Sequence, residues 1–234
     1  MRLLAFDTST DRLSIAVAVP GRAPLVHRGE GGAKASAALI PQLLDLLGQA
    51  GVPLATLDAI VFGCGPGSFT GLRTACAVAQ GLALGAGVPV LPVETLLVLA
   101  DEARARSGAT QVLAVLDARM DEVYAAEYTW GGSGWRRAAP IRLAAPQAVG
   151  PQPGWLVAGN AFAAYPGRIA PGAAQLELWP DAQALLRLAP GLLAAGEGRP
   201  ADEALPLYVR DKVAQTTEER AAARAAAAGA TITP

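Results

Sequence analysis

Apolar and polar positions alternate in short runs at the start of the chain, and this pattern predicts strands. Residues 2–7, 13–19 and 23–29 are rich in Leu, Ile, Val and Ala, and polar turns separate them. Short β-branched and apolar runs bounded by such turns are typical of strands. The chain is therefore expected to open with three strands.

The spacing of apolar residues then changes to that of a helix. Leucines at 39, 43, 46 and 47 recur on one helical face, and Gly51 with Pro53 follows them, which predicts a helix over about 35–49. An apolar run at 57–63 predicts a strand, and an Ala-rich run at 70–85 predicts a second helix. A strand at 88–93 and a helix at 94–108 come next. The expected order is three strands, helix, strand, helix, strand, helix.

The opening pattern returns near residue 110. "QVLAVLD" ends at Asp117 as "RLLAFD" ends at Asp7, and a polar turn and a second strand follow each of them. Such self-similarity indicates an internal repeat. Two β-hairpins can also resemble one another by coincidence, so the pattern alone leaves both explanations open.

Proline and glycine interrupt the second half more often, which predicts long loops and short elements. A strand is expected near 155–160 and a helix near 181–198, kinked or broken at Pro190. We divide the chain into a first half at 1–106, a second half at 107–215 whose last segment can pack back on the first, and an Ala-rich tail at 216–234. The tail has nothing large to bury and is expected to be frayed or disordered.

The stretch "GCGPGSFTGLR" from Gly63 to Arg73 lies between a strand and a helix, where a phosphate-binding loop would sit. No lysine follows the glycines as a Walker A loop requires, and Ser68 stands where the dinucleotide fingerprint needs its third glycine. These residues favour a tight turn in which Ser68 or Thr70 caps the next helix. The motif loop consists of Gly65, Pro66, Gly67, Ser68, Phe69, Thr70 and Gly71.

The helix after this loop has unusually small side chains. Gly71, Ala75, Cys76, Ala79, Gly81 and Ala83 line two of its faces, and small residues let a neighbouring helix approach closely. Either the rest of the chain or a partner must cover it, and the pattern does not decide between them.

Asp7 and Asp117 suggest a carboxylate pair for a metal ion or a general base. The turn "DTST" offers Ser9 and other small side chains to a ligand, so Asp7 and Ser9 are candidate cofactor-binding residues. The turn "DARMDE" instead places Ala118, Arg119 and Met120 where a phosphate-binding turn needs Gly, Ser or Thr. We expect these larger side chains to fill a nucleotide site. Both aspartates can equally be turn-forming residues. "LVAGNA" at 156–161 matches an adenosine-binding turn only in part.

Composition excludes several classes of protein. A net charge of -1, from 19 basic and 20 acidic residues, lacks the concentrated positive charge of a stand-alone nucleic-acid binder. Cys64 and Cys76 form no metal-binding pattern, and His27, at the end of a strand-like segment, is the single histidine on which a zinc site or a Ser-His-Asp enzyme could draw. A histidine in such a place is more often a surface residue than a catalyst. With no signal-peptide pattern and no membrane-length apolar run, we expect a cytoplasmic location.

Four segments together resemble the TsaB (YeaZ) family of tRNA threonylcarbamoyladenosine biosynthesis. They are "LLAFDTST", "GCGPGSFTGLR", "LDARMDEVYAAEY" and "PLYVRDKV", in the family's order and spacing. The resemblance implies an α/β fold of the actin-like ATPase type, related to ribonuclease H, with two similar halves. Many members carry a histidine where this chain has Ala35, so no role of that histidine carries over.

The resemblance also implies a subunit without a catalytic site of its own. Such a subunit works with TsaD and TsaE to transfer threonylcarbamoyl from its adenylate to the adenosine beside the anticodon, in tRNAs that read ANN codons. It implies a TsaD heterodimer, a ternary complex with TsaE, a homodimer of the chain alone, and contact with tRNA only through the complex. ATP or ADP and a metal are expected on the partners, with no cofactor or metal here.

The family's docking helices correspond to residues 35–49 and 70–85. On them, the expected partner-contacting residues are Leu39, Leu43, Leu72, Arg73, Cys76 and Ala79. The competing hypothesis is an enzyme in its own right, either an actin-like ATPase or kinase or a glycopeptidase-like hydrolase.

Overall fold

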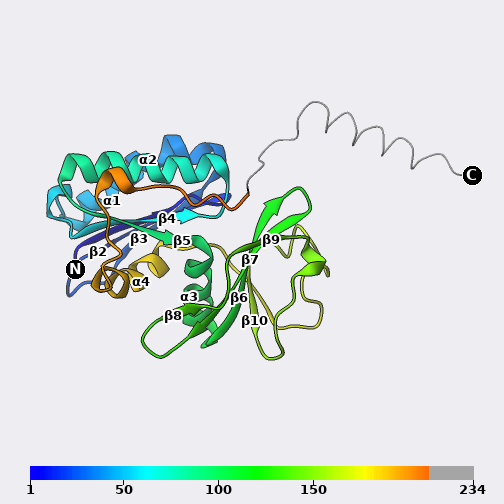
Figure 1. Ribbon diagram of the computed structural model, residues 1–234. Coiled ribbons are helices and arrows are strands. Elements are labelled where there is room, and N and C mark those ends of the chain that lie inside the picture. Colours follow the sequence, from blue (N-terminus) through cyan, green and yellow to red (C-terminus); the bar gives the residue numbers. More distant parts are fainter. Residues whose placement is uncertain (211–234) are drawn as a thin grey trace, which may run out of the picture.

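The computed structural model describes residues 1–210, which form two halves, each built on a β-sheet (Figure 1). The first sheet has the strand order β3-β2-β1-β4-β5. β1 to β3 are antiparallel neighbours, whereas β4 and β5 run parallel to β1. Its strands are β1 Leu3–Asp7, β2 Arg12–Ala18, β3 Leu25–Glu30, β4 Ala59–Gly65 and β5 Val90–Glu94.

Helices cover both faces of this sheet. Alternate residues of a strand point to opposite faces, and β1 and β4 are buried along their whole length, so both faces carry apolar side chains that need cover. Leu4 and Phe6 of β1 face a core shared with α1 and α2, while Leu3 and Ala5 face a core shared with α4. The helices are α1 Ala35–Ala50, α2 Phe69–Ala86, α3 Thr95–Ser107 and α4 Ala182–Ala194. Short 3₁₀ helices occupy Gly32–Lys34, Leu54–Thr56, Pro146–Ala148 and Ala201–Glu203.

The second sheet has the order β11-β10-β6-β7-β8, with β9 also paired to β7. α3 packs on one of its faces, and a loop containing Tyr165 and Ile169 packs on the other. Its strands are β6 Gln111–Arg119, β7 Glu122–Trp130, β8 Trp135–Arg137, β9 Arg142–Ala144, β10 Leu156–Gly159 and β11 Gln175–Glu177.

The two sheets confirm the internal repeat. In each, the first strand pairs antiparallel with the second and parallel with a later strand that arrives after a crossover. Asp7 ends β1, and Asp117 lies near the end of the corresponding strand β6. The chain therefore has the expected α/β architecture of two related halves.

The end of the described chain returns to the first half. α4 continues through Pro190 as far as Ala194, so the expected break does not occur, and it packs on the first sheet. Residues 199–210, which we call the strap, then run from a bridge between Arg199 and Val90 to the second half, where Arg210 binds the Ala118 carbonyl. Within residues 1–210 no helix is both long and apolar enough to cross a bilayer. The predicted tail at 216–234 lies outside the described residues.

Candidate functional site

The motif loop is a packed turn against the β1–β2 turn. A Cβ on Gly71 would lie 1.9 Å from the Thr8 carbonyl oxygen, and one on Gly67 would lie 2.5 Å from that of Ser9. The Ser68 amide donates to the Ser9 carbonyl at 2.7 Å, and the Thr8 hydroxyl donates to the Gly71 carbonyl at 2.8 Å. These glycines therefore allow close backbone contact, which any side chain would block.

Ser68 is the N-cap of α2. Its backbone is extended, and its hydroxyl accepts from the Gly71 amide at 3.5 Å, which satisfies one of the free donors of the first turn. Thr70, the other candidate cap, lies inside the helix and is exposed. The interpretation of the loop as a capped strand-to-helix turn is confirmed.

Five of the six expected partner-contacting side chains lie in the protein's own interior. They are at most 6% exposed because they face the first sheet from α1 and α2 or lie under the strap. These five are Leu39, Leu43, Leu72, Cys76 and Ala79. The choice of residues is therefore corrected, and Arg73 alone of the six is exposed. Whether the two helices bind a partner stays a prediction.

The outer face of α1 and α2 presents a different set of apolar side chains. Ile40 and Leu44 on α1 are 43% and 53% exposed, and Leu84 on α2 is 77% exposed. Ala77 and Gly81 are also exposed on α2. The two helices contact one another on the same side of the first sheet (Figure 1). Their outer surface, which we call the helix face, is therefore apolar and small-sided.

The chain itself does not require glycine at two positions of this face. A Cβ on Gly81 or Gly85 would meet nothing within 4 Å. Glycine inside a helix costs about 1 kcal/mol relative to alanine. Glycine allows another backbone to come close to the helix, but no described residue of this chain does so at Gly81 or Gly85. The two glycines therefore favour contact with another protein.

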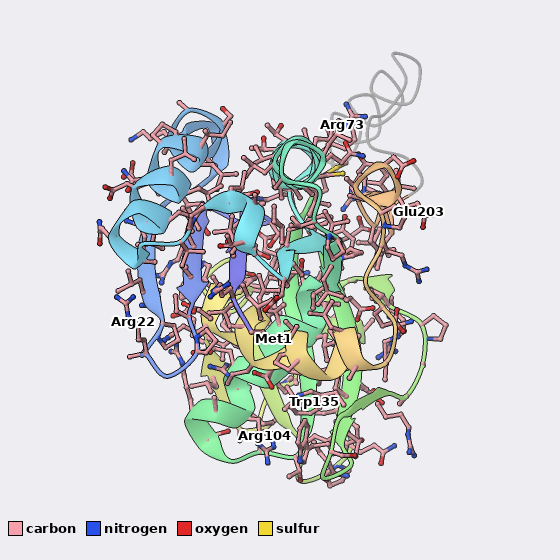
Figure 2. All side chains as sticks on the ribbon, turned by 90° about the vertical axis from the view of Figure 1, so that its left-hand side faces the viewer. Met1, Arg22, Arg73, Arg104, Trp135 and Glu203 are labelled. Carbon is pink, nitrogen blue, oxygen red and sulfur yellow. The ribbon has the colours of Figure 1, made fainter. Side chains whose placement is uncertain are left out.

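Arg73, near the N-terminus of α2, is held by two aromatic residues. Its guanidinium carbon lies 3.8 Å from the centroid of the Phe69 ring, and its Nε donates to the Tyr208 hydroxyl at 3.0 Å. Figure 2 shows Arg73 on the same side of the molecule as Glu203 of the returning chain. Tyr208 was not among the residues expected from the sequence, and the signal that could have found it was the family segment "PLYVRDKV".

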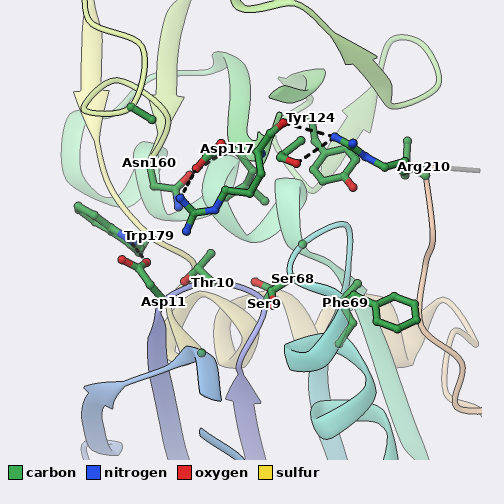
Figure 3. Close-up of a pocket in the computed structure, with 18 of the residues that line it drawn as sticks. Ser9, Thr10, Asp11, Ser68, Phe69, Asp117, Tyr124, Asn160, Trp179 and Arg210 are labelled. Carbon is green, nitrogen blue, oxygen red and sulfur yellow. Dashed lines mark hydrogen bonds and ion pairs between the residues drawn. The ribbon is translucent and has the colours of Figure 1, made fainter. Parts of the chain in front are cut away.

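A cavity of about 530 Å³ lies between the two halves (Figure 3). The turns after β1 and β6 face each other across it, and Ser9 lines it. Asp7 does not line it. Its Oδ1 accepts from the amide and hydroxyl of Ser9 at 2.8 and 2.6 Å, while its Oδ2 is buried without a partner. A cofactor role for Asp7 and Ser9 stays a prediction.

Burial dominates the chemistry of Asp7. It raises the pKa of the carboxyl above its usual 3.8, although the two hydrogen bonds from Ser9 act in the opposite direction. An isolated carboxylate is disfavoured in such surroundings. The described residues contain no group of three or more His, Cys, Asp or Glu side chains placed to hold a metal.

The turn of the second half lines the cavity. Asp117 accepts from the Arg119 amide and the Tyr165 hydroxyl, and its Oδ2 lies 3.0 Å from the Arg119 guanidinium. The Asp117 amide donates to Asn160 Oδ1 at 3.0 Å, which ties the partial "LVAGNA" match to this wall. Arg119 and Met120 line the cavity, at a turn with positive φ angles from Arg119 to Asp121. Whether their bulk fills a nucleotide site stays a prediction.

The remaining reactive side chains lie elsewhere. His27 is half-buried on β3 opposite Ile15, outside the residues that line the cavity. Cys64 and Cys76 are free and buried in the core between the first sheet and α2. Burial and the nearby Glu94 carboxylate raise the pKa of Cys64 to about 12, so it is a poor nucleophile at neutral pH.

Comparisons with known proteins agree with this fold. A family model described as TsaD, tRNA N6-adenosine threonylcarbamoyltransferase, matches residues 30–167. The tRNA threonylcarbamoyladenosine biosynthesis protein TsaB of Escherichia coli is 35% identical over 92% of the chain and 96% of its own length. The TsaB of Haemophilus influenzae is 41% identical over 53% of the chain and 52% of its own length. The structure of YeaZ from Pseudomonas aeruginosa superposes with a TM-score of 0.82 at 41% identity, covering 89% of this chain and 99% of that one.

Proposed function

Because the chain belongs to the TsaB family, whose members are named for tRNA threonylcarbamoyladenosine biosynthesis, we propose that it is a non-catalytic activating subunit of that pathway. It binds a TsaD counterpart as a heterodimer, and TsaE joins them in a ternary complex. The complex transfers threonylcarbamoyl from threonylcarbamoyl-AMP to the adenosine beside the anticodon. The partners hold the tRNA, the ATP or ADP and the metal, and the chain alone pairs with a second copy.

The observation that carries this proposal is the helix face. Ile40, Leu44 and Leu84 expose apolar area next to Gly81 and Gly85. Clustered apolar exposure of this kind marks protein interfaces more often than free surface. A partner helix lying against the glycines would bury the three large side chains and gain contacts that a Cβ would prevent.

The chemistry of the cleft supports a role without catalysis. The nucleophile-base pair of a hydrolase needs an imidazole or an equivalent base beside an activated nucleophile. His27 lies outside the residues that line the cavity, and Asp117 is already bound by Arg119 and Tyr165. A TsaD-type partner would therefore supply the catalytic groups.

Reconstitution tests the proposal directly. Purified chain, its TsaD and TsaE counterparts, threonylcarbamoyl-AMP and unmodified tRNA are combined, and modified adenosine is measured by mass spectrometry with and without the chain. We expect modification to depend on the chain. Ala77→Trp should abolish association with TsaD in size-exclusion chromatography and the modification with it, because Ala77 is an exposed residue of the helix face.

Ala139→Trp is the matched control, since Ala139 is exposed in the second half, in the segment between β8 and β9. It should bind TsaD normally. Equal modification with and without the chain would overturn the proposal, and normal binding by Ala77→Trp would show that another surface is used. Tight binding of Mg-ATP with turnover by the isolated chain would instead favour the ATPase hypothesis.

A further inference from the structure

The β6–β7 turn has an unusual backbone. Arg119, Met120 and Asp121 follow one another at φ angles of 61°, 56° and 62°, and Ala170 is the only other non-glycine residue of the described chain, 1–210, with a positive φ. This left-handed conformation brings Cβ close to the backbone, so it is uncommon outside glycine, asparagine and aspartate. Two-residue hairpin turns that need it usually contain Asn-Gly or Gly-Gly. The chain places Met120 and Asp121 there, so other contacts must hold the turn.

Two ion pairs hold the turn from within the second half. The Arg119 guanidinium lies 3.0 Å from Asp117 Oδ2, and the Arg168 guanidinium donates to Asp121 Oδ2 at 2.9 Å. Both pairs are open to water, because the side chains of Arg119 and Asp121 are 78% and 60% exposed. Exposed ion pairs contribute little stability. These two pairs therefore do not account by themselves for a run of three left-handed residues.

Arg210 of the strap holds the same turn more firmly (Figure 3). Its guanidinium donates to the Ala118 carbonyl at 2.9 Å and to the Arg119 carbonyl at 3.4 Å. It also lies 2.8 Å from the Glu122 carboxylate and donates to Met120 Sδ at 3.0 Å. The Arg210 side chain is only 12% exposed, and hydrogen bonds from a charged group that water reaches poorly are the strong ones. Arg210 is therefore the main side chain that keeps this turn left-handed.

The strap residues before Arg210 are anchored to the first half. The Leu207 amide donates to the Cys64 carbonyl on β4 at 2.7 Å, and the Tyr208 hydroxyl accepts from Arg73 Nε on α2 at 3.0 Å. Arg210 therefore reaches the second half from a segment that is fixed on the first. The family segments "LDARMDEVYAAEY" and "PLYVRDKV" meet at this contact, and the proposed function gives neither of them a role.

We propose that the strap is a latch between the two halves. Arg210 holds the β6–β7 turn in its left-handed conformation, and loss of the contact between Tyr208 and Arg73 releases Arg210 and lets the turn relax. Relaxation removes the strain of three left-handed residues, which favours the released state. The turn and residues 207–210 of the strap both line the cavity, so the latch sets the shape of one of its walls. It operates within a single chain and does not depend on the proposed function.

Hydrogen–deuterium exchange of the full chain, measured by mass spectrometry on peptides that cover the β6–β7 turn, tests the latch. We expect the amides of the turn to exchange at least tenfold faster in Arg210→Ala than in the wild type. Tyr208→Ala removes the anchor on α2 and should accelerate the same amides at least threefold. Tyr208 is 46% exposed, so this variant should fold even if Arg210→Ala does not. Met120→Gly added to either variant should slow the exchange at least threefold, because glycine adopts a positive φ without strain.

Arg22→Ala is the matched control. Arg22 also donates to a backbone carbonyl, that of Ala50 at 2.9 Å, but it lies in the first half between β2 and β3. This variant should leave the exchange of the turn unchanged. Unchanged exchange in a folded Arg210→Ala or in Tyr208→Ala, an equal acceleration in Arg22→Ala, or no slowing by Met120→Gly would overturn the latch.

Discussion

The Asp7 carboxylate lies directly against the backbone of Gly63. A Cβ added to Gly63 would stand 1.8 Å from Asp7 Oδ2 and 2.8 Å from its Cγ. Asp7 ends β1 and Gly63 lies on the neighbouring strand β4, so the first glycine of "GCGPGSFTGLR" is required by a side chain of the adjacent strand.

Gly63→Ala should destabilise the protein by about 3 kcal/mol, because a methyl group cannot fit beside a fully buried carboxylate. The free energy of unfolding is measured by urea titration. Asp7→Ala removes the obstructing atoms, so the double variant should lose less stability than the sum of the two single variants, with a coupling of about 1 kcal/mol or more. If the double variant lost the sum of the two single losses, the clash between the methyl group added at position 63 and Asp7 would not be the cause of the destabilisation by Gly63→Ala.

The contribution of Asp7 to the stability of the wild-type chain should fall as the pH rises from about 4 toward neutrality. Burial raises the pKa of Asp7 above 3.8 in the folded state, so the folded protein holds this proton more tightly than the unfolded chain. The resulting stabilisation is present below the unfolded pKa and is lost as the pH passes the folded pKa. Each tenfold difference in proton affinity between the two states is worth about 1.4 kcal/mol of unfolding free energy.

Asp7→Asn cannot titrate and should show a smaller loss of stability over the same pH range. Thermal unfolding at several pH values measures both proteins. The same pH dependence in the variant and the wild type would contradict a raised pKa at Asp7.

Gly81→Ala should stabilise the isolated chain by about 0.5–1 kcal/mol, because alanine is the better helix former and its Cβ meets no atom within 4 Å. The same change should weaken binding to TsaD, since the methyl group would separate the two helices. Calorimetry measures both quantities. If stability rose and affinity were unchanged, Gly81 would not lie at the interface.

Neither thiol should react rapidly in the folded protein. Burial raises the pKa of both cysteines, that of Cys64 to about 12, and only the thiolate is nucleophilic. A chromogenic disulfide reagent at pH 8 should therefore label both cysteines only at the rate of unfolding, and urea should accelerate the reaction strongly. Fast labelling of Cys64 without denaturant would indicate that β4 opens locally.

The sequence predicts the elements better than it predicts which faces they bury. Leucine spacing located α1, and the missing lysine identified the glycine run as a turn. On α2, however, the buried Ala79 and the exposed Ala77 look alike in sequence. Their burial is decided by the first sheet and by the strap, whose Ala204 carbonyl accepts from Cys76 Sγ at 2.9 Å, a contact across 128 residues.

The cleft illustrates a similar limit. The aspartates at 7 and 117 occupy equivalent places in the repeat, but one is buried against Gly63 and the other is bound by its own turn through Arg119. The sequence located both hairpins and left this difference open. Nor did the sequence indicate that Tyr124, the third residue of β7, would line the cavity.

The return of α4 and the strap to the first half has a consequence for synthesis on the ribosome. Leu3, Ala5 and Val61 of the first sheet are covered by Leu185 and its neighbours on α4, which are made about 120 residues later than β4. Until then this face of the sheet stays uncovered, and exposed apolar strands are prone to aggregate. A C-terminal truncation before residue 194 would shorten α4, the helix that covers this face.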